Sequence, residues 1–106
     1  MEHVLVVEDD PALGQCLRQA LSSAGYRVAL ATSTAEARKR FEPGRFALAV
    51  LDLRLPDGEG LALCREFRGQ SSLPLIVASA RGNGADRMLA LESGADMYLA
   101  KPFPLP

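Results

Sequence analysis

The stretch from Phe46 to Asp52 reads FALAVLD, an apolar run that ends in a carboxylate. So short a run with no polar residue inside it is typical of a strand buried on both faces of a parallel sheet. Pro43 and Gly44 precede the run and Pro56 follows it, and these residues predict loops on either side. We therefore predict a central strand that carries Asp52 at its carboxyl end.

Outward from this strand, short apolar runs alternate with segments of helical spacing. Helix starts are indicated by Asp10 followed by Pro11, and by Ser33 with Glu36 in capping-box spacing; Gly25 indicates a helix end. The predicted strands are His3–Val7, Arg27–Ala31, Phe46–Leu51, Leu75–Ala78 and Met97–Ala100. The predicted helices cover residues 11–24, 33–41, 59–68 and 85–93, and residues 53–58 are predicted to form a loop. This order predicts an α/β fold, a doubly wound parallel sheet with helices on both faces.

Chemically reactive side chains follow the predicted strands. Glu8 and Asp9 come after the first strand, Asp52 ends the third, Ser79 ends the fourth and Lys101 ends the fifth. In open α/β sheets the binding crevice lies outside the carboxyl ends of the strands. We therefore expect carboxylates, a hydroxyl and an ammonium group to meet at one edge of the sheet. Asp10 also follows the first strand, but we interpret it as the cap of the first helix.

Carboxylates held close together repel one another, so such a cluster favours a bound cation. Oxygen ligands with an open, hydrated position suit Mg²⁺. We expect Asp9 and Asp52 to be direct ligands and Glu8 to hold a metal-bound water. An Asp52 oxygen next to a metal is suited to attack phosphorus, with Lys101 and Ser79 contacting phosphoryl oxygens.

Four stretches carry a resemblance to a known family: VLVVEDD (4–10), VLDLRLPDGEG (50–60), IVASARG (76–82) and GADMYLAKPF (94–103). In this order they resemble the signature stretches of response-regulator receiver domains of two-component systems. The resemblance implies the flavodoxin-like (CheY-like) five-stranded sheet in the order 2-1-3-4-5. It also implies a sensor histidine kinase as phosphoryl donor, with Mg²⁺ as cofactor.

Site roles also follow from the resemblance. Asp52 matches the phosphorylated aspartate, Glu8 and Asp9 the acidic pair, Lys101 the phosphate-binding lysine and Ser79 the switch hydroxyl. The backbone carbonyl of Arg54 is expected to complete the metal ligands, and the backbone N–H of Ala80 to contact the phosphoryl group. Tyr98 matches the aromatic switch residue, and the Lys101–Pro102 peptide is expected to be cis.

The sequence departs from the family pattern in three places. Ser79 stands where threonine is commoner, and Ala100 stands at a position that is often polar. The family's fifth helix is expected to begin where this sequence stops, at Pro106. We therefore interpret residues 1–106 as a single receiver domain that ends before its last helix, which leaves the sheet face beside the first helix partly uncovered.

Composition narrows the other possibilities. The chain has 106 residues and a formal charge of −1, with no block of like charge, so nothing predicts direct binding to nucleic acid or acidic lipid. No membrane span or signal peptide is predicted, which places the protein in the cytoplasm. We interpret Cys16 and Cys64 as buried, reduced thiols.

The output of such a switch is open at this stage. A C-terminal winged-helix DNA-binding domain, which would control transcription, is favoured over a stand-alone receiver, and the face of the fourth helix, fifth strand and fifth helix is expected to dimerise when phosphorylated. A Mg²⁺-dependent phosphatase with an aspartate nucleophile is a third possibility. Such enzymes need a second acid two residues after the nucleophile, and Arg54 occupies that position. A pseudo-receiver, which serves only as a docking module, would have lost the acids or the lysine, and this sequence keeps all of them. We therefore predict a phospho-accepting regulatory domain rather than an enzyme.

Overall fold

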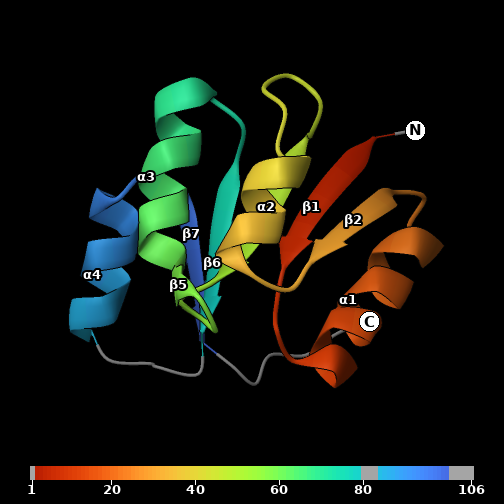
Figure 1. Cartoon of the computed structure of the whole chain (residues 1–106), viewed down its shortest axis with the longest axis horizontal. Helices are drawn as coiled ribbons and strands as arrows, with labels where there is room; N and C mark the ends of the chain where they lie inside the picture. Colours follow the sequence, from red (N-terminus) through yellow and green to blue (C-terminus); the bar gives the residue numbers. More distant parts are fainter. Residues whose placement is uncertain (1, 80–83, 101–106) are drawn as a thin grey trace.

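Five parallel strands form the centre of the molecule, and helices lie on both faces of the sheet (Figure 1). The computed structural model describes residues 2–79 and 84–100. Its elements are β1 (His3–Val7), α1 (Pro11–Ser23), β2 (Arg27–Ala31), α2 (Thr34–Arg40), β3 (Leu48–Asp52), β4 (Arg54–Leu55), β5 (Gly58–Glu59), α3 (Gly60–Gln70), β6 (Leu75–Ser79), α4 (Gly84–Glu92) and β7 (Met97–Ala100).

The strand order of the main sheet is β2-β1-β3-β6-β7, and every neighbouring pair is parallel. This is the predicted flavodoxin-like order, with β6 and β7 as the fourth and fifth strands. The predicted loop over residues 53–58 is instead a small antiparallel hairpin, in which β4 pairs with β5. Strands of two residues have no periodicity to detect, so the sequence pattern missed them.

The first two helices begin at the predicted caps. The Asp10 carboxylate caps α1 by accepting hydrogen bonds from the backbone N–H of Ala12 at 3.0 Å and of Leu13 at 3.4 Å. At α2, the Ser33 hydroxyl accepts a hydrogen bond from the N–H of Glu36 at 3.1 Å. The reciprocal half of the predicted capping box is shifted by one residue, because the Glu36 carboxylate accepts from Thr32 rather than from Ser33.

The two faces of the sheet are covered to different extents. The larger buried cluster, which includes Leu51, Leu63 and Phe67, lies between the sheet and helices α2, α3 and α4. A smaller cluster of Val4, Val6 and Leu17 lies under α1, and other sheet residues of that face are only partly buried: Val28, Leu30, Leu48 and Val50. The described sheet residues on the α1 side are thus less buried than those that face α2, α3 and α4.

The two cysteines differ in environment. Cys64 is buried, and its burial raises the pKa of its thiol. The prediction that Cys16 is buried is wrong, because this side chain is exposed. The buried stripe of α1 runs through Gly14 and Leu17, and Cys16 lies about 100° around the helix from Leu17, beyond the edge of that stripe. No helix in the described part of the chain is long and apolar enough to cross a membrane.

Candidate functional site

The carboxyl ends of the two central strands bring three acidic residues together. The register pairs Val7 of β1 with Leu51 of β3, so the next residues, Glu8 and Asp52, leave the sheet side by side. Glu8 is 3% exposed and Asp52 is 8% exposed, whereas the neighbouring Asp9 is exposed to solvent. We call Glu8, Asp9 and Asp52 the acidic rim.

Ligand oxygens of the three rim carboxylates all lie within 4.8 Å of one another. Two negative charges about 5 Å apart repel by roughly 3 kcal/mol at an effective dielectric constant near 20. Burial of Glu8 and Asp52 limits the screening of this repulsion by water. A divalent cation relieves the repulsion, and a donor set made only of carboxylate oxygens fits a hard ion such as Mg²⁺.

Backbone N–H groups hold the rim carboxylates in place. The Glu8 Oε2 atom accepts a hydrogen bond from the N–H of Asp10 at 3.1 Å, at the start of α1. The Asp52 Oδ1 atom accepts one from the N–H of Arg54 at 3.3 Å, at the start of the hairpin. Each acid is therefore fixed by the loop that follows its own strand.

Gly60 is a positioning residue that sequence reasoning missed. Its N–H donates to the carbonyl of Leu53 at 2.9 Å, and a Cβ at this position would lie 1.8 Å from the backbone oxygen of Asp52. Only glycine permits that approach, so α3 begins directly against the backbone that carries Asp52. The signal in the sequence is the glycine at the end of LPDGEG, which falls at the start of the predicted third helix.

Asp57 is a second missed residue, and it connects the hairpin to α2. Its two carboxylate oxygens accept hydrogen bonds from the N–H groups of Thr34 at 2.7 Å and Ala35 at 3.0 Å. These backbone donors, chiefly that of Thr34, lower the pKa of the Asp57 carboxyl below its ordinary value. The first turn of α2 is thus capped by a residue of the loop that follows Asp52, a long-range contact that no local sequence pattern indicates.

The other predicted site residues lie on β6, β7 and β4, or outside the described part of the chain. Ser79 ends β6 and is 2% exposed, one residue beyond the pairing of Asp52 with Ala78. Tyr98 of β7 is 9% exposed and lies in the core cluster, and its buried hydroxyl has no hydrogen-bond partner among the described residues. The side chain of Arg54 is exposed. Ala80, Lys101 and the Lys101–Pro102 peptide lie outside the described residues.

This sheet order and acidic rim define a protein class, and comparison with known proteins identifies the family. The model of the response regulator receiver domain family matches residues 4–106. The chain therefore belongs to the receiver domain family of two-component response regulators, as the four sequence stretches had predicted. The chain is 43% identical over 103 residues to the KDP operon transcriptional regulatory protein KdpE of Escherichia coli, covering 97% of this chain and 46% of that protein.

A second curated relative is the response regulator MprA of Mycobacterium tuberculosis, 43% identical over 103 residues, with 96% of this chain and 45% of that protein covered. The chain thus spans a little under half the length of these relatives. Among solved structures, the non-phosphorylated receiver domain of HemR from Leptospira biflexa superposes with a TM-score of 0.93 at 37% identity, covering 98% of this chain and 85% of that chain.

One further solved structure bears on the chemistry of the rim. A response regulator from Burkholderia pseudomallei, solved with a phosphorylated aspartic acid, a calcium ion and citrate, superposes with a TM-score of 0.89 at 29% identity. The match covers 98% of this chain and 62% of that chain. A relative of the same fold therefore carries both an aspartyl phosphate and a divalent cation.

Proposed function

We propose that this domain is a signalling switch that accepts a phosphoryl group on Asp52 from the phosphohistidine of a sensor histidine kinase, with Mg²⁺ as cofactor. The observation that carries the proposal is the acidic rim: ligand oxygens of Glu8, Asp9 and Asp52 lie within 4.8 Å of one another at the end of a parallel sheet. Neighbouring carboxylates of this kind are destabilising unless a cation or a shared proton compensates them.

The residues that would hold Mg²⁺ are the rim carboxylates and the backbone carbonyl of Arg54. Asp9 and Asp52 would bind the ion directly, and Glu8 would bind one of its waters. The bound ion would neutralise negative charge on the carboxylates and on an incoming phosphoryl group. The hydrogen bonds from Asp10 to Glu8 and from Arg54 to Asp52 support this role, because they fix the acids before any ligand arrives.

The phosphoryl transfer itself needs a nucleophile and charge stabilisation. A carboxylate oxygen of Asp52 attacks phosphorus, the N–P bond of the phosphohistidine breaks, and the leaving imidazole takes up a proton. We assign Lys101 to one phosphoryl oxygen, and the Ser79 hydroxyl and the Ala80 N–H to the others. The burial of Ser79 at the end of β6 supports its assignment.

The response to phosphorylation is assigned to Ser79 and Tyr98. A phosphoryl group adds a charge of about −1.5 to −2 next to the Ser79 hydroxyl and draws it toward the site. Tyr98 then changes position, and a change at β7 is passed to the surface. The buried hydroxyl of Tyr98 supports this assignment, because it has no hydrogen-bond partner in the described part of the chain and an unsatisfied group makes the present position easier to leave.

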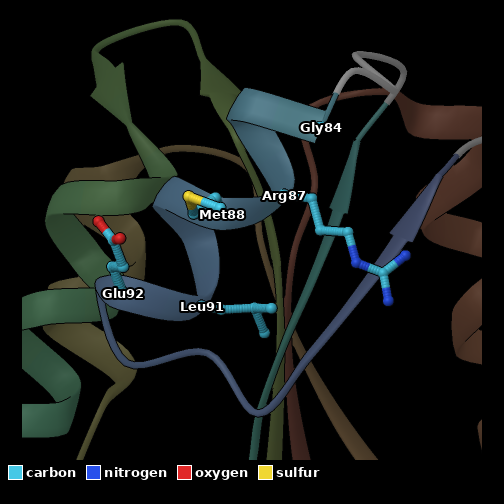
Figure 2. A pocket seen from close by; sticks show the side chains of 5 residues that line it. All are labelled: Gly84, Arg87, Met88, Leu91 and Glu92. Atoms are coloured by element: carbon cyan, nitrogen blue, oxygen red, sulfur yellow. The ribbon is translucent and has the colours of Figure 1, made fainter.

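The surface that carries the signal is assigned to α4 and β7. Figure 2 shows Arg87 and Leu91, one turn apart on α4, extending on the same side of the helix beside a pocket. Met88 is 62% exposed, Leu91 is 42% exposed and Met97 of β7 is 50% exposed. Phosphorylation is proposed to make this surface a dimer contact, and sedimentation of the chain with and without beryllofluoride tests it. Dimerisation that persists in Met88→Glu would contradict the assignment.

We assign the domain a regulatory role rather than enzymatic turnover. An aspartate-nucleophile phosphatase uses an acid two residues after its nucleophile, to protonate the leaving group. Here that residue is Arg54, whose exposed side chain carries no proton that it can release near neutral pH. Turnover of a phosphate ester by the domain, measured by phosphate release, would contradict this assignment.

The output of the switch is proposed to be control of transcription. Curated relatives are named transcriptional regulatory proteins, and this chain matches a little under half of their length. We therefore propose that residues 1–106 form the receiver domain of a cytoplasmic regulator that binds DNA through a separate C-terminal domain. Sequencing the reading frame beyond the codon for Pro106 tests this; a stop codon there favours a stand-alone receiver.

The experiment for the central proposal is labelling by a small phosphoryl donor. The chain is incubated with acetyl phosphate, with and without Mg²⁺, and its intact mass is measured. The wild-type chain should gain one phosphoryl group only with Mg²⁺, and Asp52→Asn should gain none. The matched control is Glu59→Gln, an exposed carboxylate on the adjacent hairpin, which should label like wild type. Labelling of Asp52→Asn would overturn the proposal.

A further inference from the structure

The strand β2 forms an open edge of the main sheet, beside α1 and α2 (Figure 1). The Arg27 N–H donates to the carbonyl of Glu2, and the Ala31 carbonyl accepts from the N–H of Glu8, so the backbone groups of these β2 residues point toward β1. Backbone direction alternates along a parallel strand. The N–H and carbonyl groups of Val28 and Leu30 therefore point away from β1, toward the open edge.

At one end of this edge, a side chain already accepts the outward backbone hydrogen bond. Thr32 follows β2 and its N–H would continue the outward row, but this N–H donates to the carboxylate of Glu36 at 2.9 Å. Within the described residues no strand pairs with β2 on its outer side. The outer side thus offers the hydrogen-bonding groups of Val28 and Leu30 to an added strand, over a length that ends at Glu36.

A groove of about 450 Å³ runs along this edge, and its charged lining is strongly basic. It is lined by Arg18 of α1, Arg27 of β2, Arg40 of α2 and Arg45, with Glu36 as the one acidic residue. We call it the basic groove. Because Arg18 and Arg40 come from helices on opposite faces of the sheet, the positive charge surrounds the open strand edge on both sides.

Three of these arginines form no close ion pair with another described residue, and the charge of Arg40 helps the backbone N–H of Thr32, the main cause, to lower the pKa of Glu36. Within the described part of the chain, no carboxylate lies within 4.0 Å of the guanidinium groups of Arg18, Arg27 or Arg40, whereas Arg45 pairs with Glu42 at 3.2 Å. The whole chain carries a formal charge of −1, so the positive charge is a local feature of this groove. A negatively charged ligand would therefore be attracted to the strand edge rather than to the surface in general.

We propose that the basic groove binds an acidic, extended polypeptide segment of a partner protein, which adds to the sheet as a strand next to β2. The backbone of Val28 and Leu30 would supply the main-chain hydrogen bonds, and the arginines would select acidic side chains. The proposal concerns a surface separate from the acidic rim and does not depend on phosphorylation of Asp52.

Charge favours an acidic protein over other occupants. A second copy of this chain pairing through its own β2 would bring two arginine clusters together, and like charges protect strand edges from that pairing. A nucleic acid would match the charge, but it has no alternating amide donors and acceptors to pair with Val28 and Leu30. The main-chain groups thus distinguish a polypeptide from a polyanion.

The test uses the ¹⁵N-labelled chain and a peptide of alternating glutamate and valine residues. We expect the N–H signals of Val28 and Leu30 to shift and to gain protection from hydrogen exchange when the peptide binds. Arg18→Glu and Arg27→Glu should each weaken binding about tenfold or more, equivalent to about 1.4 kcal/mol. The matched control is Arg65→Glu on the exposed surface of α3, which should bind as wild type does.

Two probes decide whether the interaction is the proposed one. The same peptide with its central valine replaced by proline cannot form the ladder and should bind more weakly. Equal binding of this peptide, or binding of inorganic polyphosphate or single-stranded RNA at the same arginines without protection of Val28 and Leu30, would overturn the proposal in favour of a polyanion site. Absence of binding by the alternating peptide at low salt would also overturn it.

Discussion

The core that packs against α2 and α3 differs from the acidic rim in whether neighbouring side chains attract or repel one another. In the core, the Phe41 and Phe67 rings stack with centroids 4.0 Å apart, and Phe67 is 1% exposed. At the rim, the buried carboxylates Glu8 and Asp52 share a small space with Asp9. Core contacts stabilise the fold, whereas the three rim carboxylates repel one another at short range. Local conflicts of this kind are expected at functional sites.

Because of this difference, substitutions in the two regions should change the free energy of unfolding in opposite directions. The largest change is expected in the core. Phe67→Ala removes a buried ring and leaves a cavity, so the free energy of unfolding should fall by about 3–5 kcal/mol. Urea unfolding measures it. Leu91→Ala, at an α4 residue that is 42% exposed, is the control and should change stability by less than about 0.5 kcal/mol. Equal losses in the two variants would break the distinction.

The next effect lies where the core meets the rim. Gly60→Ala places a methyl group against the backbone oxygen of Asp52, so we expect a loss of about 1–3 kcal/mol from overpacking. Gly69→Ala is a matched control in the same helix, because nothing lies within 4 Å of a Cβ added there. The control should be neutral or stabilising by up to about 1 kcal/mol, from helix propensity. A stabilising Gly60→Ala would show that the close approach is not required.

At the rim we expect a substitution to raise the free energy of unfolding rather than to lower it. Without metal, Asp9→Asn removes one of the repelling charges and should raise the free energy of unfolding by about 1 kcal/mol. With millimolar Mg²⁺ the wild type should gain stability and the variant should gain less, because one ligand is lost. Thermal unfolding in chelator and in Mg²⁺ measures both. A clear loss of stability for Asp9→Asn in chelator would mean that Asp9 is a structural acceptor.

The smallest effect concerns the connection between the rim loop and α2. The N–H groups that Asp57 caps lower the pKa of its carboxyl in the folded chain. The ionised carboxylate therefore stabilises the fold at pH values above 3.8, the pKa of this group in the unfolded chain. That contribution is lost as the pH falls below this value. Asp57→Asn should be less stable than wild type at pH 7, and the difference should shrink toward pH 3. A difference that does not depend on pH would remove the charge from the explanation.

Much of the fold was predictable because its signals are local. The strands Arg27–Ala31 and Met97–Ala100 were predicted with their observed bounds, and the caps at Asp10 and Ser33 follow from short patterns. Within the site, the meeting of Glu8 with Asp52 followed from one general rule about the edges of parallel sheets.

The missed features depend on contacts between distant segments. Asp57 caps a helix that begins 23 residues earlier in the sequence. Gly60 is required by a backbone atom of Asp52, and Cys16 is exposed because the buried stripe of α1 is narrower than its run of apolar residues. Each depends on how two elements are placed in space, which periodicity and capping patterns do not contain.

The central claim is that Asp52 is the residue that receives the phosphoryl group at the acidic rim. The most direct measurement labels the chain with acetyl phosphate and Mg²⁺, reduces it with borohydride, and maps the product by peptide mass spectrometry. Reduction converts an aspartyl phosphate into homoserine. We expect homoserine at position 52 and at no other aspartate position. Homoserine at Asp9 or Asp57, or a chain that remains unlabelled with Mg²⁺ present, would contradict it.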